Sequence, residues 1–187
     1  MTIVWEDAVH LARAARREGT TRDAFRMLRT DAWFLLALFR MRRACLKLRI
    51  PVLNRVLRLM QMVFGGIELG NDIVLGRGVY LVHSLGTVIG GRAVVGDRVR
   101  FLGNNTVGTA RDNGHPVIED DVEVGCGARI LGPVRVGRGA VIGANAVVLS
   151  DVPAYAVAVG APARVVGFAK HAPQATPAPA TERRVIA

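Results

Sequence analysis

An apolar residue returns at every sixth position along most of the middle of this 187-residue chain. Side chains of a helix or an ordinary strand repeat their direction at about 3.6 or 2 residues, so neither element explains the period. A short strand with its turn occupies six residues, and three such units close one triangular coil. The period therefore predicts a mainly β fold, a left-handed parallel β-helix. The repeat positions are Leu69, Leu75, Leu81, Ile89, Val95, Phe101, Val107, Ile118, Val124, Ile130, Val136, Ile142 and Val148.

A second row of small or apolar residues follows four positions after most of the repeat positions, as a narrow coil interior requires. The repeat is interrupted twice, by two extra residues within 82–88 and by five within 108–117. Each break contains a histidine, His83 in the first and His115 in the second. The second row comprises Ile73, Val79, Leu85, Ala93, Val99, Val122, Ala128, Val134, Ala140 and Ala146.

Composition divides the chain into three predicted segments. Residues 1–64 form a basic helical segment, with thirteen Lys and Arg against five Asp and Glu. Residues 65–168 form the β-helix and hold nine residues of each sign. Residues 169–187, rich in alanine and proline, are predicted to be a disordered tail. The open ends of a stacked coil need caps, and the helices and the segment after residue 148 are suited to cap them.

The helical spacing of apolar residues predicts three helices in the basic segment. The first covers residues 2–19. The second begins with an N-cap at Thr21 or Asp23 and runs toward Arg49. The third begins at Pro51, because proline suits the first turn of a helix, and stops at a Gly-Gly pair.

The predicted helices carry most of the net charge of +10. Such a region is most often a solvated face or a subunit contact, and peripheral contact of residues 1–64 with an anionic membrane is the alternative. The basic residues form no aromatic-rich platform, so no nucleic-acid partner is expected. The two cysteines make no disulfide framework, and the longest strongly apolar run, 32–39, is too short to span a bilayer. We therefore expect a cytoplasmic protein, or one held peripherally at the inner face of the membrane.

Several motifs lie within the repeat and beside it. They are GIE at 66–68, LGRG at 75–78, LVHSLGTVIGG at 81–91, HP at 115–116, VEVGCGARILGPVRVGRGAVIGANAVVLSDVP at 122–153 and VGAPARVVG at 159–167. Together they resemble the hexapeptide-repeat acyltransferases, in the branch shared by serine O-acetyltransferases and colanic-acid or exopolysaccharide O-acetyltransferases. The resemblance implies an acetyl-CoA-dependent O-acetyltransferase that works by direct transfer. It also implies a homotrimer with sites between subunits, and leaves open whether two trimers pair into a hexamer.

His83 is the predicted catalytic base. Transfer of an acetyl group from a thioester to a hydroxyl needs a neutral imidazole within hydrogen-bond reach, because an alcohol is a weak nucleophile until its proton has an acceptor. A turn that leaves a rigid coil can supply this group, and the resemblance matches His83 to the base of the family. Serine acetyltransferases have an Asp just before this histidine, which helps to hold the histidine and the amino acid. This chain has Val82 there.

The resemblance also implies roles for residues near the two breaks. His115 matches the histidine that contacts acceptor or thioester in the resembling enzymes. Glu68 matches an acidic residue near the catalytic histidine, where it would orient the imidazole or bind the acceptor, with an ordinary charged corner as the alternative. Asp112 and Asn113 are candidates to replace the missing Asp or to contact sugar hydroxyls.

Acetyl-CoA is the implied acyl donor, bound along a groove of the coil. Cys126 and Ala144 are one coil apart at positions that line this groove in the resembling enzymes. Gly108, Thr109 and Arg164 are candidates to contact the pantetheine or the phosphates. Cys126 is expected to pack rather than to act as a nucleophile, because direct transfer needs no covalent step. The histidines and cysteines show no metal-ligand spacing, so no metal is expected.

Three functions stay open for the chain as a whole. The first, favoured by Val82 and by a loop without the glycine-rich run of serine acetyltransferases, is transfer to a sugar hydroxyl of a surface polysaccharide or its precursor. The second is serine O-acetyltransferase of cysteine biosynthesis, which keeps His83, His115 and Glu68. Docking to cysteine synthase is doubtful, because the sequence ends in Ile-Ala rather than in isoleucine. The third is a non-catalytic structural β-helix.

Overall fold

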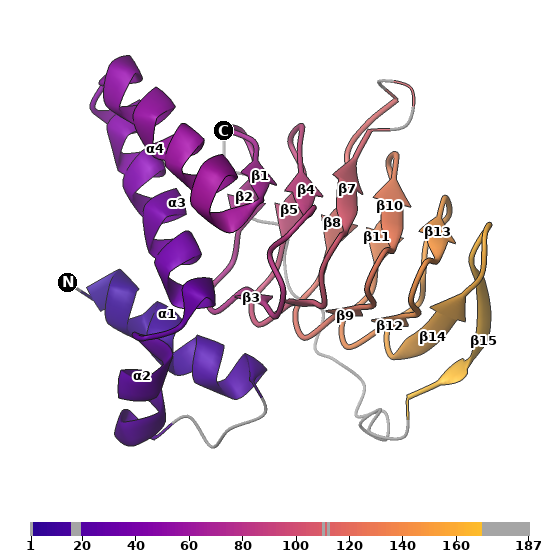
Figure 1. Ribbon diagram of the computed structural model, residues 1–187. Helices are drawn as coiled ribbons and strands as arrows, with labels where there is room; N and C mark the ends of the chain where they lie inside the picture. The colour runs from indigo at the N-terminus through magenta and orange to yellow at the C-terminus, as the bar shows by residue number, and fades with distance from the viewer. Residues whose placement is uncertain (1, 16–19, 110, 112, 170–187) are drawn as a thin grey trace, which may run out of the picture.

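The computed structural model describes residues 2–15, 20–109, 111 and 113–169, as helices followed by a β-solenoid (Figure 1). The helices are α1 (Thr2–Ala14), α2 (Thr21–Met27), α3 (Asp31–Lys47) and α4 (Pro51–Gly65). The strands are β1 (Glu68–Leu69), β2 (Val74–Leu75), β3 (Tyr80–Leu81), β4 (Val88–Ile89), β5 (Val94–Val95), β6 (Arg100–Phe101), β7 (Thr106–Gly108), β8 (Val117–Ile118), β9 (Glu123–Val124), β10 (Arg129–Leu131), β11 (Arg135–Val136), β12 (Val141–Ile142), β13 (Val147–Val148), β14 (Ala156–Val159) and β15 (Arg164–Phe168).

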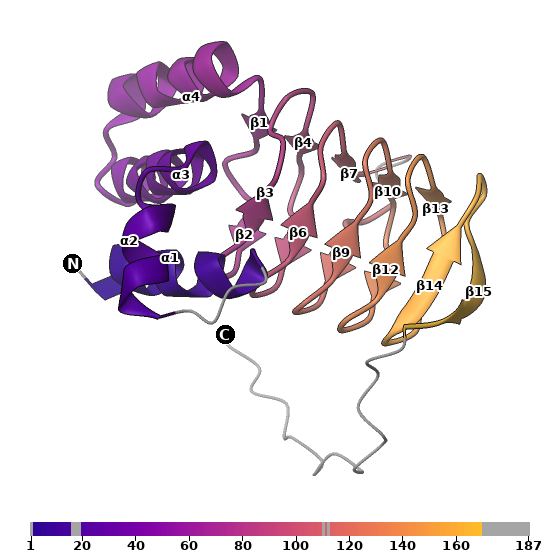
Figure 2. The same ribbon diagram turned by 60° about the horizontal axis from the view of Figure 1, so that its bottom comes forward.

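From β1 to β13, successive strands join three sheets in rotation, and these sheets are the sides of the solenoid. Their orders are β1-β4-β7-β10-β13, β11-β8-β5-β2 and β15-β14-β12-β9-β6-β3. Neighbours are parallel and in register one coil apart, with Leu69 opposite Ile89 for example, whereas the closing hairpin of β14 and β15 is antiparallel. Figure 2 shows the helices at one end of the solenoid and this hairpin at the other. The predicted β-helix with a preceding helical segment is confirmed.

The thirteen repeat positions form the core of the solenoid, and each is at most 6% exposed. The second row is buried as predicted except for Leu85, which is 76% exposed. The prediction for Leu85 was wrong because the first break adds two residues to this turn. Leu85 therefore points outward, and Thr87 occupies the buried position instead. One coil later Asn105 is buried, where its side chain accepts a hydrogen bond from the Gly103 amide at 3.0 Å and donates one to the Gly125 carbonyl at 2.7 Å.

The second predicted helix is interrupted, which corrects the prediction. The segment expected to run unbroken toward Arg49 is two helices, and α2 is capped by Thr20, just before the predicted N-caps. At the break, Thr30 Oγ1 donates a hydrogen bond to the Met27 carbonyl at 2.7 Å and accepts one from the Trp33 amide at 3.4 Å. A single side chain thus bonds the end of one helix and the start of the next, which favours a break here.

The third predicted helix is confirmed. α4 begins at Pro51 and ends at Gly65, and Gly66 follows in the left-handed conformation that favours glycine, with φ at 58°. The remainder of the first predicted helix, 16–19, and the predicted tail beyond residue 169 lie outside the described residues. No helix in the described part of the chain is long and apolar enough to cross a membrane.

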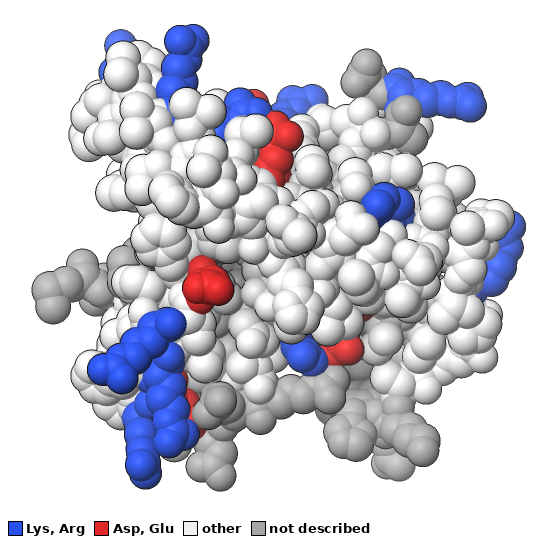
Figure 3. All heavy atoms as spheres, viewed as in Figure 1, with Lys and Arg blue, Asp and Glu red and all other residues white. Residues whose placement is uncertain are grey.

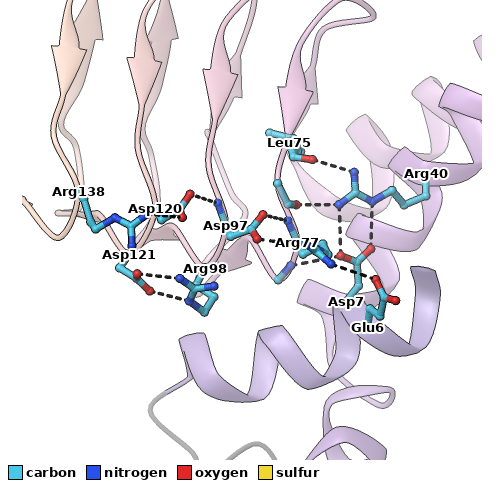
Figure 4. Close-up of polar contacts among 12 residues, drawn as sticks. Glu6, Asp7, Arg40, Leu75, Arg77, Asp97, Arg98, Asp120, Asp121 and Arg138 are labelled. Carbon is cyan, nitrogen blue, oxygen red and sulfur yellow. Dashed lines mark hydrogen bonds and ion pairs between the residues drawn. The ribbon is translucent and has the colours of Figure 1, made fainter. Parts of the chain in front are cut away.

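Polar contacts fix the helices against the first coils of the solenoid (Figure 4). Arg40 of α3 forms an ion pair with Asp7 of α1 at 3.0 Å and donates hydrogen bonds to the carbonyls of Leu75 and Gly76. Asp97 of the next coil accepts a hydrogen bond from the backbone of the same corner at 2.7 Å. These contacts hold the middle of α3 beside the corner that follows β2.

Candidate active site

The His83 turn, residues 82–87, connects β3 to β4. It lies at the corner of the solenoid where the strands of the five-stranded sheet begin, and we call each of the two corners that border this sheet an edge. The backbone of the turn is bonded to the structure on both sides. The Gly86 amide donates a hydrogen bond to the Gly66 carbonyl at 2.8 Å, and the Leu85 carbonyl accepts one from the Asn104 amide at 3.1 Å. His83 is exposed. The solenoid therefore presents an accessible imidazole from a turn whose backbone is held in place.

A cleft of about 440 Å³, the His83 cleft, opens between this turn and the start of α3. A second cleft of about 360 Å³ adjoins it and is lined mainly by apolar side chains of α3 and α4. The two clefts share Asp31, Leu35 and Ser84. The His83 cleft is lined by Arg29, Thr30, Asp31, Ala32, Leu35, Tyr80, Leu81, Val82, His83, Ser84 and Leu85.

Two side chains of opposite charge line the His83 cleft together with the imidazole. Asp31 lies in the first turn of α3, where the helix dipole favours acidic residues, and Arg29 lies in the short connection from α2. Neither residue was predicted from the sequence, because only the packing of α3 against the first coil brings them to His83. The available signal was the Thr30-Asp31 pair, which is typical of a helix start.

His115 lies in the loop between β7 and β8, at the other edge, where the strands of the five-stranded sheet end. Its half-buried imidazole packs over Gly91 of the preceding coil, where an added Cβ would lie 2.4 Å from Nδ1. Gly91 also has φ at 65°, so this position needs glycine for its conformation and for its contact. His115 Nδ1 is buried and has no hydrogen-bond partner among the described residues. Packing therefore holds this ring.

The predicted site residues fall into two groups, one at each edge of the five-stranded sheet. Within the described residues of one chain, His115 lines neither the His83 cleft nor the cleft that adjoins it. Asp112 lies outside the described residues. The edge that carries His83 also carries Glu68, Cys126 and Ala144, and the edge that carries His115 also carries Gly108, Thr109 and Asn113.

Glu68 is separate from the His83 cleft. It begins β1, and its carboxylate forms an ion pair with Arg58 of α4. The Glu68 side chain is 42% exposed and does not line the cleft. The structure therefore gives this carboxylate a partner other than the imidazole.

Cys126 and Ala144 lie on successive coils and are both exposed. The Asn145 amide donates a hydrogen bond to the Cys126 carbonyl at 2.8 Å, which joins the two turns. Their small side chains leave this edge of the coil open to an extended ligand. Arg164 lies on β15, where its guanidinium donates to the Ala163 carbonyl at 2.9 Å. In the described part of the chain, no group of three or more His, Cys, Asp or Glu side chains is placed to hold a metal ion.

Sequence comparison finds relatives over the solenoid. The bacterial transferase hexapeptide family (six repeats) matches residues 115–150. The chain is 39% identical over 121 residues to the serine acetyltransferase of Synechococcus elongatus. That match covers 63% of this chain and 50% of the relative, so the chain spans about half the length of that protein.

Solved structures share the fold over most of the chain. Soybean serine acetyltransferase complexed with serine has a TM-score of 0.76 and 32% identity, and the match covers 89% of this chain and 70% of that protein. A serine acetyltransferase in complex with CoA has a TM-score of 0.75 and 30% identity, with 86% of this chain and 68% of that protein covered. The likeness thus includes both the helices and the solenoid.

Proposed function

We propose that this chain transfers the acetyl group of acetyl-CoA to the hydroxyl of L-serine, because it belongs to the hexapeptide-repeat acyltransferase family, in the branch of the serine acetyltransferases. The observation that carries the proposal is the cleft that His83 shares with Asp31 and Arg29. An imidazole, a carboxylate and a guanidinium in one cleft match the hydroxyl, the ammonium and the carboxylate of a free amino acid.

The charges of the cleft favour an amino acid over the sugar acceptor that the sequence favoured. The sugar acceptor was favoured partly because Val82 stands where serine acetyltransferases have an Asp, so the carboxylate next to the base is missing. Asp31 brings a carboxylate to the same cleft from α3, so the missing charge has a substitute in space. A neutral sugar can form hydrogen bonds with Asp31 and Arg29 but offers neither of them an opposite charge. The likeness to serine acetyltransferases supports the same choice.

His83 acts as the general base in the proposed reaction. Its imidazole takes the hydroxyl proton of serine while the serine oxygen forms a bond to the thioester carbonyl carbon. The tetrahedral intermediate then breaks its bond from carbon to sulfur, and the imidazolium returns the proton to the CoA thiolate. The acetyl group moves in one transfer to the serine oxygen, and CoA leaves as a thiol. No side chain is acylated, so Cys126 needs no nucleophilic role.

The two edges of the five-stranded sheet suggest how a complete site forms. Cys126 and Ala144 lie open on the His83 edge, where the pantetheine arm of acetyl-CoA would run. His115 lies at the other edge, so both histidines reach one site only if a second copy places its His115 edge against this His83 edge. A homotrimer repeats this contact around a threefold axis and completes three sites.

Thiol release from acetyl-CoA tests the proposed acceptor. With L-serine as the only acceptor, the purified protein is expected to release CoA at a rate that rises and saturates with serine concentration. L-alanine is the matched control, because it has the same ammonium and carboxylate but no hydroxyl. Release with a sugar and none with L-serine would overturn the proposal. Release with neither acceptor would favour a non-catalytic β-helix.

Asp31→Asn is expected to raise KM for L-serine about 10- to 100-fold, because a hydrogen bond to a charged group contributes about 1.5 to 3 kcal/mol. Asparagine keeps the size of the side chain and suits a helix start, so α3 is retained. Steady-state kinetics with varied serine measure the change. Asp23→Asn is the matched control, since Asp23 lies in the first turn of α2 and does not line the cleft. An unchanged KM in Asp31→Asn would remove Asp31 from acceptor binding.

A further inference from the structure

Helix α4 is turned so that two polar side chains and Leu57 face the protein. Its buried residues include Asn54 and Gln61, whose side-chain oxygens both accept hydrogen bonds from Arg42 of α3. The opposite side of the helix is apolar and faces outward. This outer row, the α4 stripe, comprises Val52, Val56, Leu59 and Val63, which are 47% to 74% exposed.

The connection from α3 to α4 extends the α4 stripe beyond the helix. Leu48 is 69% exposed and Ile50 is 41% exposed. Figure 2 shows α4 as an outer helix beside the first strands, and in Figure 3 the surface over α4 is mostly uncharged, with basic side chains at its end. An apolar surface that continues along a whole helix and its connection is larger than scattered exposed residues, and it indicates a binding face.

Basic residues surround the α4 stripe. Lys47, Arg49 and Arg55 are exposed beside it, and residues 32–67 contain no Asp or Glu. Arg58 is paired with Glu68 beside the stripe. In the described part of the chain, no carboxylate pairs with Lys47, Arg49 or Arg55. The face therefore combines apolar side chains with uncompensated positive charge.

This combination of apolar side chains and positive charge favours one kind of binding partner over another. A two-fold contact that pairs α4 with α4 of a second copy would place the same cations opposite one another, which costs free energy. An anionic bilayer fits both features, because the apolar side of a helix enters the boundary between headgroups and acyl chains while flanking cations meet lipid phosphates. We propose that α4 and the α3–α4 connection bind the surface of an anionic lipid bilayer, with α4 lying in the plane of the membrane.

Sedimentation of the full chain with lipid vesicles tests this proposal. The protein is expected to sediment with vesicles of phosphatidylcholine and phosphatidylglycerol in equal amounts, and not with vesicles of phosphatidylcholine alone. Each basic residue near an anionic surface contributes about 1 kcal/mol, so Arg49→Gln with Arg55→Gln should weaken binding on the order of 25-fold. Val56→Ser with Val63→Ser should weaken it on the order of tenfold through lost apolar burial.

Two double variants serve as matched controls. Arg22→Gln with Arg26→Gln removes the same charge from α2, and Val165→Ser with Val166→Ser changes two exposed valines of β15. Both should retain wild-type binding. Equal sedimentation with the two kinds of vesicle, or equal losses in the controls, would overturn the proposal. It would also be overturned if Val56→Ser with Val63→Ser left vesicle binding intact and lowered the molar mass measured by light scattering, because the stripe would then contact a second copy.

Discussion

His83→Ala is expected to lower kcat for acetyl transfer to L-serine on the order of 10² to 10⁴-fold, the usual contribution of a general base. Without the imidazole, the serine hydroxyl keeps its proton as it approaches the thioester. The turn itself should survive, because its backbone bonds to Gly66 and Asn104 do not use the His83 side chain. Thiol release with saturating serine and acetyl-CoA measures the effect.

Two further measurements separate a chemical role of His83 from a structural one. His171→Ala is the matched control, a histidine outside the described residues, and should keep the wild-type rate. Undiminished turnover in a His83→Ala protein that keeps the wild-type molar mass would exclude His83 as the base.

The regular part of the fold was predictable because one short unit repeats. Each of the thirteen repeat positions faces the same narrow interior, so six-residue spacing alone identifies the buried residues. The prediction failed at Leu85, because the first break adds residues and the six-residue spacing no longer identifies which side chain points inward. It failed again at the α2–α3 break, because the hydrogen bonds of one residue, Thr30, decide where a helix ends. Both failures lie beside His83.

The candidate site was less predictable than the core. His83 and His115 stand out as the histidines of the two breaks, but Asp31 and Arg29 belong to a helical segment whose position against the coil no local pattern encodes. Contacts such as that of Arg40 with Asp7 and the first coil set this position. The position of Glu68 at the start of the first coil was predictable from the sequence, but its ion pair with Arg58 was not. Residues contributed by packing between segments therefore needed the structure.

Arg42→Ala is expected to destabilise the protein by about 3 to 5 kcal/mol, because Arg42 is 1% exposed and bonds only to neutral acceptors. Burial lowers the pKa of its guanidinium by disfavouring the charged form, and the nearby Arg58 lowers it further, while Glu68 opposes both effects. Removing the side chain leaves several buried or half-buried acceptors unpaired where α3, α4 and the first coil meet. These acceptors are Asn54 Oδ1, Gln61 Oε1, the Leu69 carbonyl and Asn71 Oδ1.

Thermal unfolding at one fixed protein concentration measures this effect. For a chain of this size the expected loss corresponds to a fall in Tm of about 10 °C. Arg43→Ala is the matched control: Arg43 is the next residue, is only half-buried, and donates a hydrogen bond to the Asn71 carbonyl at 2.9 Å. Arg42→Lys should fall between the two, since an ammonium keeps the charge but loses the planar fork that reaches several acceptors. A Tm of Arg42→Ala or Arg42→Lys no lower than that of Arg43→Ala would show that the buried guanidinium does not hold the helices to the solenoid.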